Sequence, residues 1–375
     1  MKRYLCKPRQ NWQEIVSSIG LTYHTHENGP YWSEGVYYEF NSRQIDELEA
    51  ATNELHELCI KAAEYVIEKN LWSELGIPKH VIPGILQSWE RDDFSLYGRF
   101  DLAYDGINPP KLLEYNADTP TALVEAALAQ WFWKEEVFAS KDQFNSIHEN
   151  LIAAWKKSPA TLIHFAGIDK NLEDHQTISY LVDTAIQAGL ETKWLAISEI
   201  GYDESARDFV DAAMNKVLGS LFKLYPWEWM FHEDFGQYLN QSKVQFIEPL
   251  WKALLSNKGI LPILWKLFPD HPNLLPCYTS PQLLGKNYVR KPLLSREGAN
   301  VSVVKNGITV AENGGEYGEE GFIYQELADI PLFDGFRPIV GSWVINHYAC
   351  GIGIREDNSL ITGNLSRFVP HVTTN

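Results

Sequence analysis

Four polar side chains in two short segments have the types and the spacing to do chemistry. Arg99 and Asp101 lie two residues apart, and so do Glu114 and Asn116. Side chains two apart on a strand point to the same face, so pairing of the two segments brings these groups together. Asp101, Glu114 and Asn116 would then offer hard oxygen ligands of the kind that Mg²⁺ takes, and Arg99 a fork for phosphate oxygens. The alternative interpretation is a solvated sheet face.

A second candidate is a loop with small residues that lies between two strand-like runs, within residues 288–303. A loop containing Gly298 can present backbone N–H groups to the oxygens of a triphosphate, and Lys291 could reach a phosphate as a point charge. The patterns GxxxxGK[ST], HRD and DFG are absent, which excludes a P-loop ATPase and a protein kinase. The alternative is an ordinary hairpin with an exposed basic residue.

A third candidate is Arg355, which follows a glycine-rich run and precedes an acidic turn. A permanently charged guanidinium suits the negative charge that develops in acyl or phosphoryl transfer. Pairing with the nearby acids is the alternative. The strand-like segment 321–328 could offer backbone groups to an adenine at its exit. The eleven histidines form no Ser/His/Asp arrangement, and a GxSxG elbow is absent.

Composition narrows the classes of protein. The 375 residues include 32 Lys and Arg against 49 Asp and Glu, a formal net charge of −17. Such a chain has no basic stripe for nucleic acid, although it would attract a cationic substrate. The four cysteines are far apart, so neither a CxxC motif nor a zinc cluster is expected. No apolar window is long enough to span a membrane and no signal peptide is evident, so we expect a cytoplasmic protein.

The elements that must position these residues can be predicted in outline. Residues 41–70 have the apolar spacing of an amphipathic helix, with Asn41 or Ser42 as its N-cap. Residues 96–104 and 111–116 alternate around a turn with Asp-Gly and two prolines, which predicts a β-hairpin. Thr119 and the proline after it are expected to open a helix that runs to about residue 133.

Two later regions differ in pattern. Strand-like runs at 161–166 and 192–197 alternate with helical stretches at 174–188 and 205–216, which predicts a small parallel sheet. Residues 258–368 instead predict an antiparallel-rich α+β region. Its expected strands are 288–293, 300–304, 321–325, 339–344 and 360–362.

Together these segments resemble the synthetase domain of the glutathionylspermidine synthase family, from about residue 10 to the end. The bifunctional members also carry an amidase domain, so this chain is similar to the stand-alone short members. The matching segments are Gly98-Arg99-Phe100-Asp101, Leu113-Glu114-Tyr115-Asn116-Ala117-Asp118-Thr119-Pro120-Thr121, Trp227-Glu228, Ser256-Asn257-Lys258, His271-Pro272-Asn273-Leu274-Leu275, Lys291-Pro292, Arg296-Glu297-Gly298-Ala299-Asn300, Glu312-Asn313-Gly314-Gly315, Ile323-Tyr324-Gln325-Glu326, Gly353-Ile354-Arg355 and Leu360-Ile361-Thr362-Gly363.

The resemblance implies an α/β (α+β) fold of the glutathione-synthetase-like kind: a circularly permuted ATP-grasp fold with an inserted pre-ATP-grasp domain. We expect residues 1–150 to hold the magnesium-ligand hairpin, 151–250 to form the inserted α/β substrate domain, and 251–375 to form the lid and nucleotide-binding part. This order agrees with the sequence of patterns described above.

The resemblance also implies roles for residues. The Mg²⁺ ligands would be Asp101, Glu114 and Asn116, and Arg355 would steady the transferring phosphoryl group, with Arg99 as a second catalytic group. Substrate contacts would include Thr119 and Thr121, which are serine in the family pattern, together with Glu173 and Asp174. The ATP-binding residues would be Arg99, Phe100, Asp101, Lys258, Lys291, Gly298, Gln325, Glu326, Leu327, Ala328, Leu360, Ile361 and Thr362.

The implied activity is an ATP- and Mg²⁺-dependent ligation of a carboxylic acid to an amine through an acyl phosphate. The implied partners are small molecules, a glutathione-like peptide and a polyamine, and neither nucleic acid nor a membrane. Two alternatives remain open. One is a non-catalytic nucleotide- or peptide-binding protein on a ligase fold, and the other is a phosphotransferase.

Overall fold

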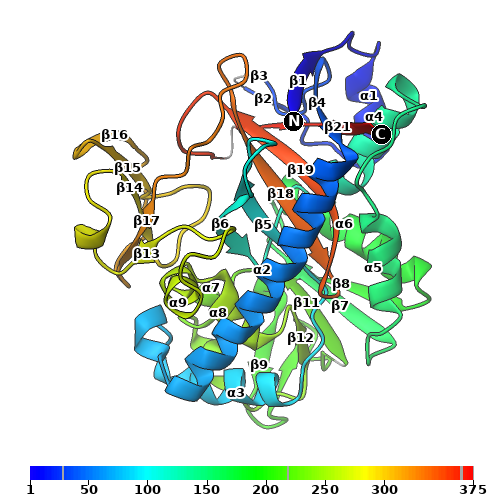
Figure 1. Ribbon diagram of the computed structural model, residues 1–375. Helices are drawn as coiled ribbons and strands as arrows, with labels where there is room; N and C mark the ends of the chain where they lie inside the picture. The colour runs from blue at the N-terminus through cyan, green and yellow to red at the C-terminus, as the bar shows by residue number, and fades with distance from the viewer. Residues whose placement is uncertain (28, 218, 364–365, 375) are drawn as a thin grey trace.

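An antiparallel five-stranded sheet forms the centre of the computed structural model, which describes residues 1–27, 29–217, 219–363 and 366–374. Its strand order is β20-β19-β18-β5-β6 (Figure 1). The predicted hairpin is confirmed as β5 and β6, with Asp101 opposite Glu114 and Arg99 opposite Asn116. The strands are β5 (Tyr97–Ala103), β6 (Lys111–Asn116), β18 (Arg337–Ile345), β19 (Tyr348–Asp357) and β20 (Arg367–Val369).

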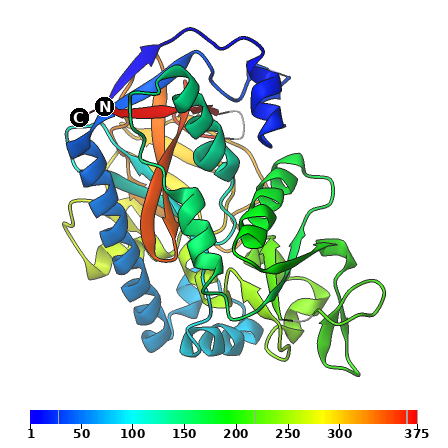
Figure 2. The same ribbon diagram turned by 90° about the vertical axis from the view of Figure 1, so that its right-hand side faces the viewer.

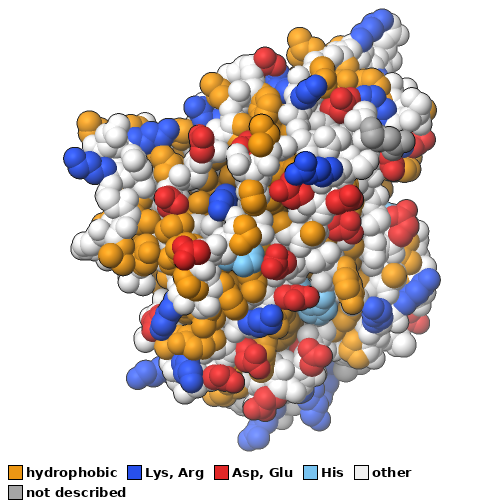
Figure 3. Space-filling model, in the orientation of Figure 1, with side chains coloured by type: hydrophobic (Ala, Val, Ile, Leu, Met, Phe, Trp, Pro, Cys, Tyr) orange, Lys and Arg blue, Asp and Glu red, His pale blue; other side chains and the backbone are white. Residues whose placement is uncertain are grey.

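Helices cover both faces of this sheet. The predicted amphipathic helix is confirmed as α2 (Ser42–Lys69), which packs on one face and begins with a capping box between Asn41 and Gln44. Acidic and basic side chains are interspersed on the face of the molecule that α2 crosses (Figure 3). The opposite face is covered by α5 (Ile147–Trp155) and by the helical stretch that ends with α4 (Gln130–Val137) (Figure 2).

The predicted small parallel sheet is also confirmed. Its order is β12 (Gln245–Ile247), β11 (Ser220–Leu224), β7 (Leu162–Gly167) and β8 (Glu191–Ala196), and α6 (Leu172–Gln187) packs against it. The helix predicted at 205–216 is wrong, because this stretch contains β10 (Asp208–Val210), which pairs with β9 (Gly201–Asp203). Asp211 accepts hydrogen bonds from the backbone N–H groups of Ala213 and Asn215, a local turn that competes with a helix.

A second antiparallel sheet projects to one side of the molecule (Figure 1, left). Three of its strands confirm predicted ones, whereas the predicted strand at 360–362 is wrong because this segment is an irregular loop. The sheet has the order β13 (Cys277–Tyr278), β17 (Phe322–Glu326), β14 (Tyr288–Pro292), β15 (Ser302–Lys305) and β16 (Ile308–Glu312).

The helix after the hairpin begins later than predicted. Residues 119–122 are not helical, Ala122 has a left-handed φ of 65°, and the helix starts at Leu123 with a π-helical turn at Glu125–Ala129. Thr119 is therefore not an N-cap. It belongs instead to an irregular segment that is held by side chains distant in sequence, as described below.

A three-stranded sheet brings strands from the two ends of the chain together. Strands from 1–150 and from 251–375 share the central sheet, and β4 lies between β1 and β21, while the three-part division of the chain stays a prediction. No helix in the described part of the chain is long and apolar enough to cross a membrane. The remaining strands and helices are β1 (Lys2–Leu5), β2 (Thr25–His26), β3 (Gly29–Pro30), β4 (Val36–Asn41), β21 (His371–Thr374), α1 (Trp12–Ser18), α3 (Ile82–Glu90), α7 (Trp227–Met230), α8 (Ala253–Ser256) and α9 (Ile260–Leu267).

Candidate active site

One large cavity lies between the central sheet and the projecting sheet, and most of the predicted site residues line it. Segments from all three predicted parts of the chain contribute to it. The predicted site residues on its wall are Arg99, Asp101, Glu114, Asn116, Thr119, Thr121, Glu173, Lys258, Lys291, Gly298, Gln325, Glu326, Leu327, Ala328, Arg355, Leu360, Ile361 and Thr362. Their gathering from distant segments is a structural finding, whereas their individual roles stay predictions.

Two predicted residues do not line the cavity. Phe100 is fully buried on the other side of β5 and stacks on Tyr115 with ring centroids 3.9 Å apart. This follows from strand alternation, since Arg99 and Asp101 face the cavity. The side chain of Phe100 therefore does not reach the cavity wall, and its predicted contact with ATP stays a prediction. Asp174 lies just behind the wall in α6, where burial and the nearby Glu173 raise its pKa to about 7.

Asp101 is held by two arginines from different strands. Arg99 Nε donates to Asp101 Oδ1 at 2.7 Å, and Arg355 Nη2 donates to Asp101 Oδ2 at 2.6 Å. The strand β18 lies between β5 and β19, and its Gly341 is opposite Asp101. A Cβ at Gly341 would lie 2.9 Å from Arg99 Cδ, so the absence of a side chain there leaves room for the arginine.

Glu114 forms the second charged contact of the hairpin. Its Oε2 lies 3.1 Å from Lys258 Nζ, and its Oε1 accepts a hydrogen bond from Asn116 Nδ2 at 3.3 Å. Burial alone would raise the pKa of Glu114, but the positive charges of Lys258 and Lys291 outweigh burial and lower it. Glu114 is therefore a carboxylate at neutral pH and remains a ligand for cations.

Lys291 extends from β14 toward the central sheet and is nearly buried. Its ammonium donates to the backbone oxygen of Leu113 at 2.8 Å and to Gln325 Oε1 at 2.7 Å. Burial lowers the pKa of Lys291 to about 8, although the negative charge of Glu114 opposes the shift. Because β14 and β17 pair directly, Lys291 and Gln325 present one cation and one amide to the same part of the cavity.

The predicted phosphate loop covers the cavity and touches the 360–363 segment. Gly298 has a left-handed φ of 72°, and a Cβ there would lie 2.7 Å from the backbone oxygen of Thr362. Only glycine fits both requirements. The loop is tied to the cavity wall because Lys258 Nζ donates to the backbone oxygen of Ser295 at 2.8 Å.

Several cavity residues were not given a role by sequence reasoning. Asp118, Glu228 and Arg296 lie inside segments that match the family pattern, so the sequence could have indicated them. Tyr23 and Tyr31 come from an N-terminal region without a matching segment. Arg296 of the covering loop lies 3.8 Å from Glu228 of α7. Burial raises the pKa of Glu228, and Arg296 opposes this shift.

The donor set of the hairpin fits a magnesium ion that arrives with a nucleotide. Two carboxylates and one amide face the cavity from paired strands, and Mg²⁺ is typically held by one or two carboxylates together with water and substrate phosphates. Among the residues that the structure describes, no group of three or more His, Cys, Asp or Glu could hold a metal by itself. Asp101, Glu114 and Asn116 would thus form an incomplete site that phosphate oxygens complete, and this role stays a prediction.

Comparison with solved structures identifies the fold. A solved structure of a glutathione synthetase-like effector from Globodera pallida, in apo form, covers 99% of this chain and 100% of its own, with a TM-score of 0.61 and 10% sequence identity. At this identity the likeness shows the fold alone. The chain therefore has a mixed α/β fold of the glutathione-synthetase-like kind.

Sequence comparison gives the family. The family described as "Glutathionylspermidine synthase preATP-grasp" matches residues 3–374. A Haemophilus influenzae protein described as "Putative acid--amine ligase" is 42% identical over 391 residues, which cover 99% of each chain. The trypanothione synthetase of Crithidia fasciculata is 31% identical over 366 residues, or 88% of this chain and 55% of that protein. The chain belongs to the glutathionylspermidine synthase family, which is a family of C–N ligases.

Proposed function

We propose that the protein is an ATP-dependent carboxylate–amine ligase with a circularly permuted ATP-grasp architecture. One observation carries this proposal: the cavity gathers three arginines, two lysines and an incomplete set of oxygen ligands from segments far apart in the chain. A pocket that must align and neutralise a triphosphate needs these groups. The membership in a ligase family supports the same reaction class.

The reaction proceeds in two displacements. An oxygen of the acid's carboxylate attacks the γ-phosphorus of ATP, the bond to the β,γ-bridging oxygen breaks, and ADP leaves. The nitrogen of the amine then attacks the carbonyl carbon of the acyl phosphate, the C–O bond to phosphate breaks, and an amide forms as the nitrogen loses its proton. Phosphoryl transfer asks for little covalent chemistry from the protein, so positioning and charge stabilisation dominate.

Each group of cavity residues has its own role in this reaction. Lys258, Lys291 and the exit of β17 at 325–328 hold the nucleotide, and the loop containing Gly298 excludes water from the reacting atoms. Arg355 meets the negative charge that develops on the transferring phosphoryl group, with Arg99 beside it. Mg²⁺ bound at Asp101, Glu114 and Asn116 would neutralise phosphate oxygens.

The acid and the amine are proposed from the family and from the charge of the chain. A glutathione-like peptide would bind beside Thr119 and Thr121, where the added methyl groups narrow the space that serine would leave. A polyamine suits a protein with a net charge of −17 and with Glu173 on the cavity wall. Both substrates are small molecules that the cavity would enclose.

The decisive experiment is a substrate screen that measures ADP release. Purified protein with ATP and Mg²⁺ is offered glutathione and related γ-glutamyl peptides, each with and without spermidine and other amines. A ligase releases ADP at a rate that needs both the acid and the amine, and mass spectrometry finds the amide. ADP release with a single acceptor would instead identify a phosphotransferase, and nucleotide binding without any ADP would identify a binding protein.

A further inference from the structure

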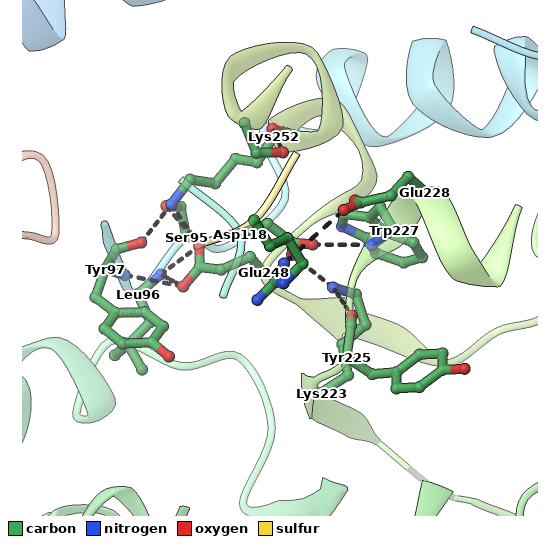
Figure 4. A network of polar contacts seen from close by, with 12 residues as sticks. Ser95, Leu96, Tyr97, Asp118, Lys223, Tyr225, Trp227, Glu228, Glu248 and Lys252 are labelled. Atoms are coloured by element: carbon green, nitrogen blue, oxygen red, sulfur yellow. Dashed lines mark hydrogen bonds and ion pairs between the residues drawn. The ribbon is translucent and has the colours of Figure 1, made fainter. Parts of the chain in front are cut away.

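A fully buried ion pair joins the parallel sheet to the cavity wall. Lys223 in β11 and Asp118 just after β6 are 0% and 2% exposed, and Lys223 Nζ donates to Asp118 Oδ1 at 2.5 Å. The same ammonium donates to the backbone oxygen of Tyr225 at 3.0 Å and lies 4.1 Å from the ring centroid of Trp227. Figure 4 shows the side chains of Lys223 and Asp118 together with Tyr225 and Trp227.

The other oxygen of Asp118 fixes a second part of the wall. Asp118 Oδ2 accepts from the backbone N–H of Trp227 at 2.9 Å, at the start of the short helix α7. The next residue, Glu228, lines the cavity and faces Arg296 of the covering loop. A single carboxylate therefore connects the end of β6 with α7.

The segment that follows Asp118 is irregular, so it depends on such anchors. Thr119 and Thr121 line the cavity, and the backbone oxygen of Thr121 accepts from Arg99 Nη1 at 2.6 Å. Ala122 then turns the chain with a left-handed φ of 65°. The described contacts thus hold residues 118–121 at both ends, by Lys223 at one end and by Arg99 at the other.

A second buried pair provides a comparison within the same molecule. Glu248 and Lys252 are 0% and 1% exposed and lie 2.7 Å apart, and Glu248 accepts from the backbone N–H groups of Leu96 and Tyr97 at the start of β5 (Figure 4). Neither Glu248 nor Lys252 lines the cavity. This pair ties the same parallel sheet to the same hairpin without touching the 119–122 segment.

We propose that Asp118 is a positioning residue for the acid substrate. It acts through the segment containing Thr119 and Thr121, and Lys223 holds it in place. Desolvation offsets most of the attraction within a buried ion pair, so such a pair contributes little net stability. We therefore expect the removal of the pair to affect activity more than the free energy of unfolding. This inference rests on the proposed function, because Thr119 and Thr121 are assigned to the acid there.

The test compares two neutralised pairs. The first variant combines Asp118→Asn with Lys223→Met, which retains an acceptor for the Trp227 N–H and leaves no buried charge alone. The control combines Glu248→Gln with Lys252→Met. Both are compared with the unaltered protein by melting temperature, by amide hydrogen exchange in the segment 119–122 (at Thr119, Thr121 and Ala122, since Pro120 has no amide hydrogen), and by affinity for a non-hydrolysable ATP analogue with Mg²⁺. ADP release with glutathione and spermidine then gives KM for glutathione and kcat.

We expect a difference between the variants that stability does not explain. In the Asp118 variant, exchange at 119–122 quickens and kcat/KM for glutathione falls about 100-fold, the scale that a small misplacement can produce. The analogue binds as it does to the unaltered protein. The control variant shows neither effect, whether or not its melting temperature changes.

Two results would overturn the proposal. One is unchanged exchange at 119–122 in the Asp118 variant, and the other is a loss of kcat/KM no larger than that of the control. If the unaltered protein releases no ADP with this substrate pair, it is the substrate assignment that fails. Exchange at 119–122 and kcat/KM for the acid that the substrate screen identifies then decide about Asp118, since a positioning role lowers kcat/KM for that acid and an anchor without function leaves it unchanged.

Discussion

Asp101 accepts a hydrogen bond from Arg355 at 2.6 Å, although 254 residues separate the two along the chain. The contact crosses β18, and the absence of a side chain at Gly341 leaves space for Arg99 beside it. The arginine proposed to stabilise the transferring phosphoryl group is therefore oriented by the carboxylate proposed to bind Mg²⁺. In the proposed mechanism, charge stabilisation and metal binding are therefore coupled through the side chain of Asp101.

Replacing Arg355 tests its assigned role most directly. We expect Arg355→Ala to lower kcat for ADP formation by about 10²–10³-fold, since a preformed donor for developing charge is lost. The affinity for an ATP analogue, measured by calorimetry, should change little because Lys258 and Lys291 remain. Arg337→Ala serves as the control, because Arg337 lies on the neighbouring strand and outside the cavity. Normal turnover in Arg355→Ala would refute the role.

A substitution at Gly341 tests the position of Arg99 without removing any charged side chain. In Gly341→Ala the new Cβ would approach Arg99 Cδ to 2.9 Å and the backbone oxygen of Gly353 to 3.3 Å. Such overpacking costs about 1–3 kcal/mol, and we expect lower kcat because Arg99 must move. The control is Gly201→Ala, where nothing lies within 4 Å. Unchanged kcat in Gly341→Ala, with a crystal structure showing Arg99 in place, would contradict this account.

The lowered pKa of Lys291 predicts a pH dependence for nucleotide binding. Burial lowers this pKa to about 8, and phosphate oxygens bind the ammonium form. The Kd of the ATP analogue should be constant below about pH 8 and should rise above it, approaching tenfold for each pH unit. Lys291→Arg should remove the rise, since a guanidinium stays charged. A constant Kd from about pH 6.5 to about pH 9.5 in the unaltered protein would disagree.

The free energy of unfolding should increase over the pH range in which nucleotide binding weakens. An unfolded lysine titrates near pH 10.4, so between about pH 8 and about pH 10 the unfolded chain holds more protons than the folded one. The contribution of Lys291 to the free energy of unfolding therefore increases as pH rises through this range. Denaturant titrations of the unaltered protein and of Lys291→Met should diverge in that window.

The incomplete oxygen site predicts that metal and nucleotide bind together. Without nucleotide, Asp101 is paired with two arginines and Glu114 with Lys258, so Mn²⁺ in place of Mg²⁺ should bind weakly. Adding the ATP analogue should tighten Mn²⁺ binding in an electron paramagnetic resonance titration. Glu114→Gln should weaken this ternary binding because a charged ligand is lost, whereas Glu312→Gln, on β16, should not. Tight Mn²⁺ binding to the free protein would argue for a resident metal instead.

The parts of the fold that local pattern determines could be predicted from the sequence. The hairpin follows from alternation around a strong turn, and α2 follows from its apolar stripe and its cap. The gathering of Asp101, Glu114 and Asn116 then follows from strand geometry. In β5 the polar alternation does not mark a solvated face, because every residue of this strand is buried.

The errors share a physical cause, which is a long-range or side-chain partner that local pattern does not reveal. Residues 119–122 are not helical, and Lys223 and Arg99 hold this segment from outside. The 205–216 stretch turns because Asp211 binds nearby backbone N–H groups. The 360–362 segment packs against Gly298 instead of joining a sheet.

The strand order of the central sheet also bears on how the chain folds during synthesis. The hairpin of β5 and β6 obtains its neighbour β18 only after more than two hundred further residues have been made, whereas the parallel sheet is complete by Ile247. Pairings between strands so distant in sequence form slowly, and an unpaired strand edge promotes aggregation. The nascent chain must therefore keep the edge of β5 protected until β18 emerges, and truncation before residue 337 would leave that edge permanently open.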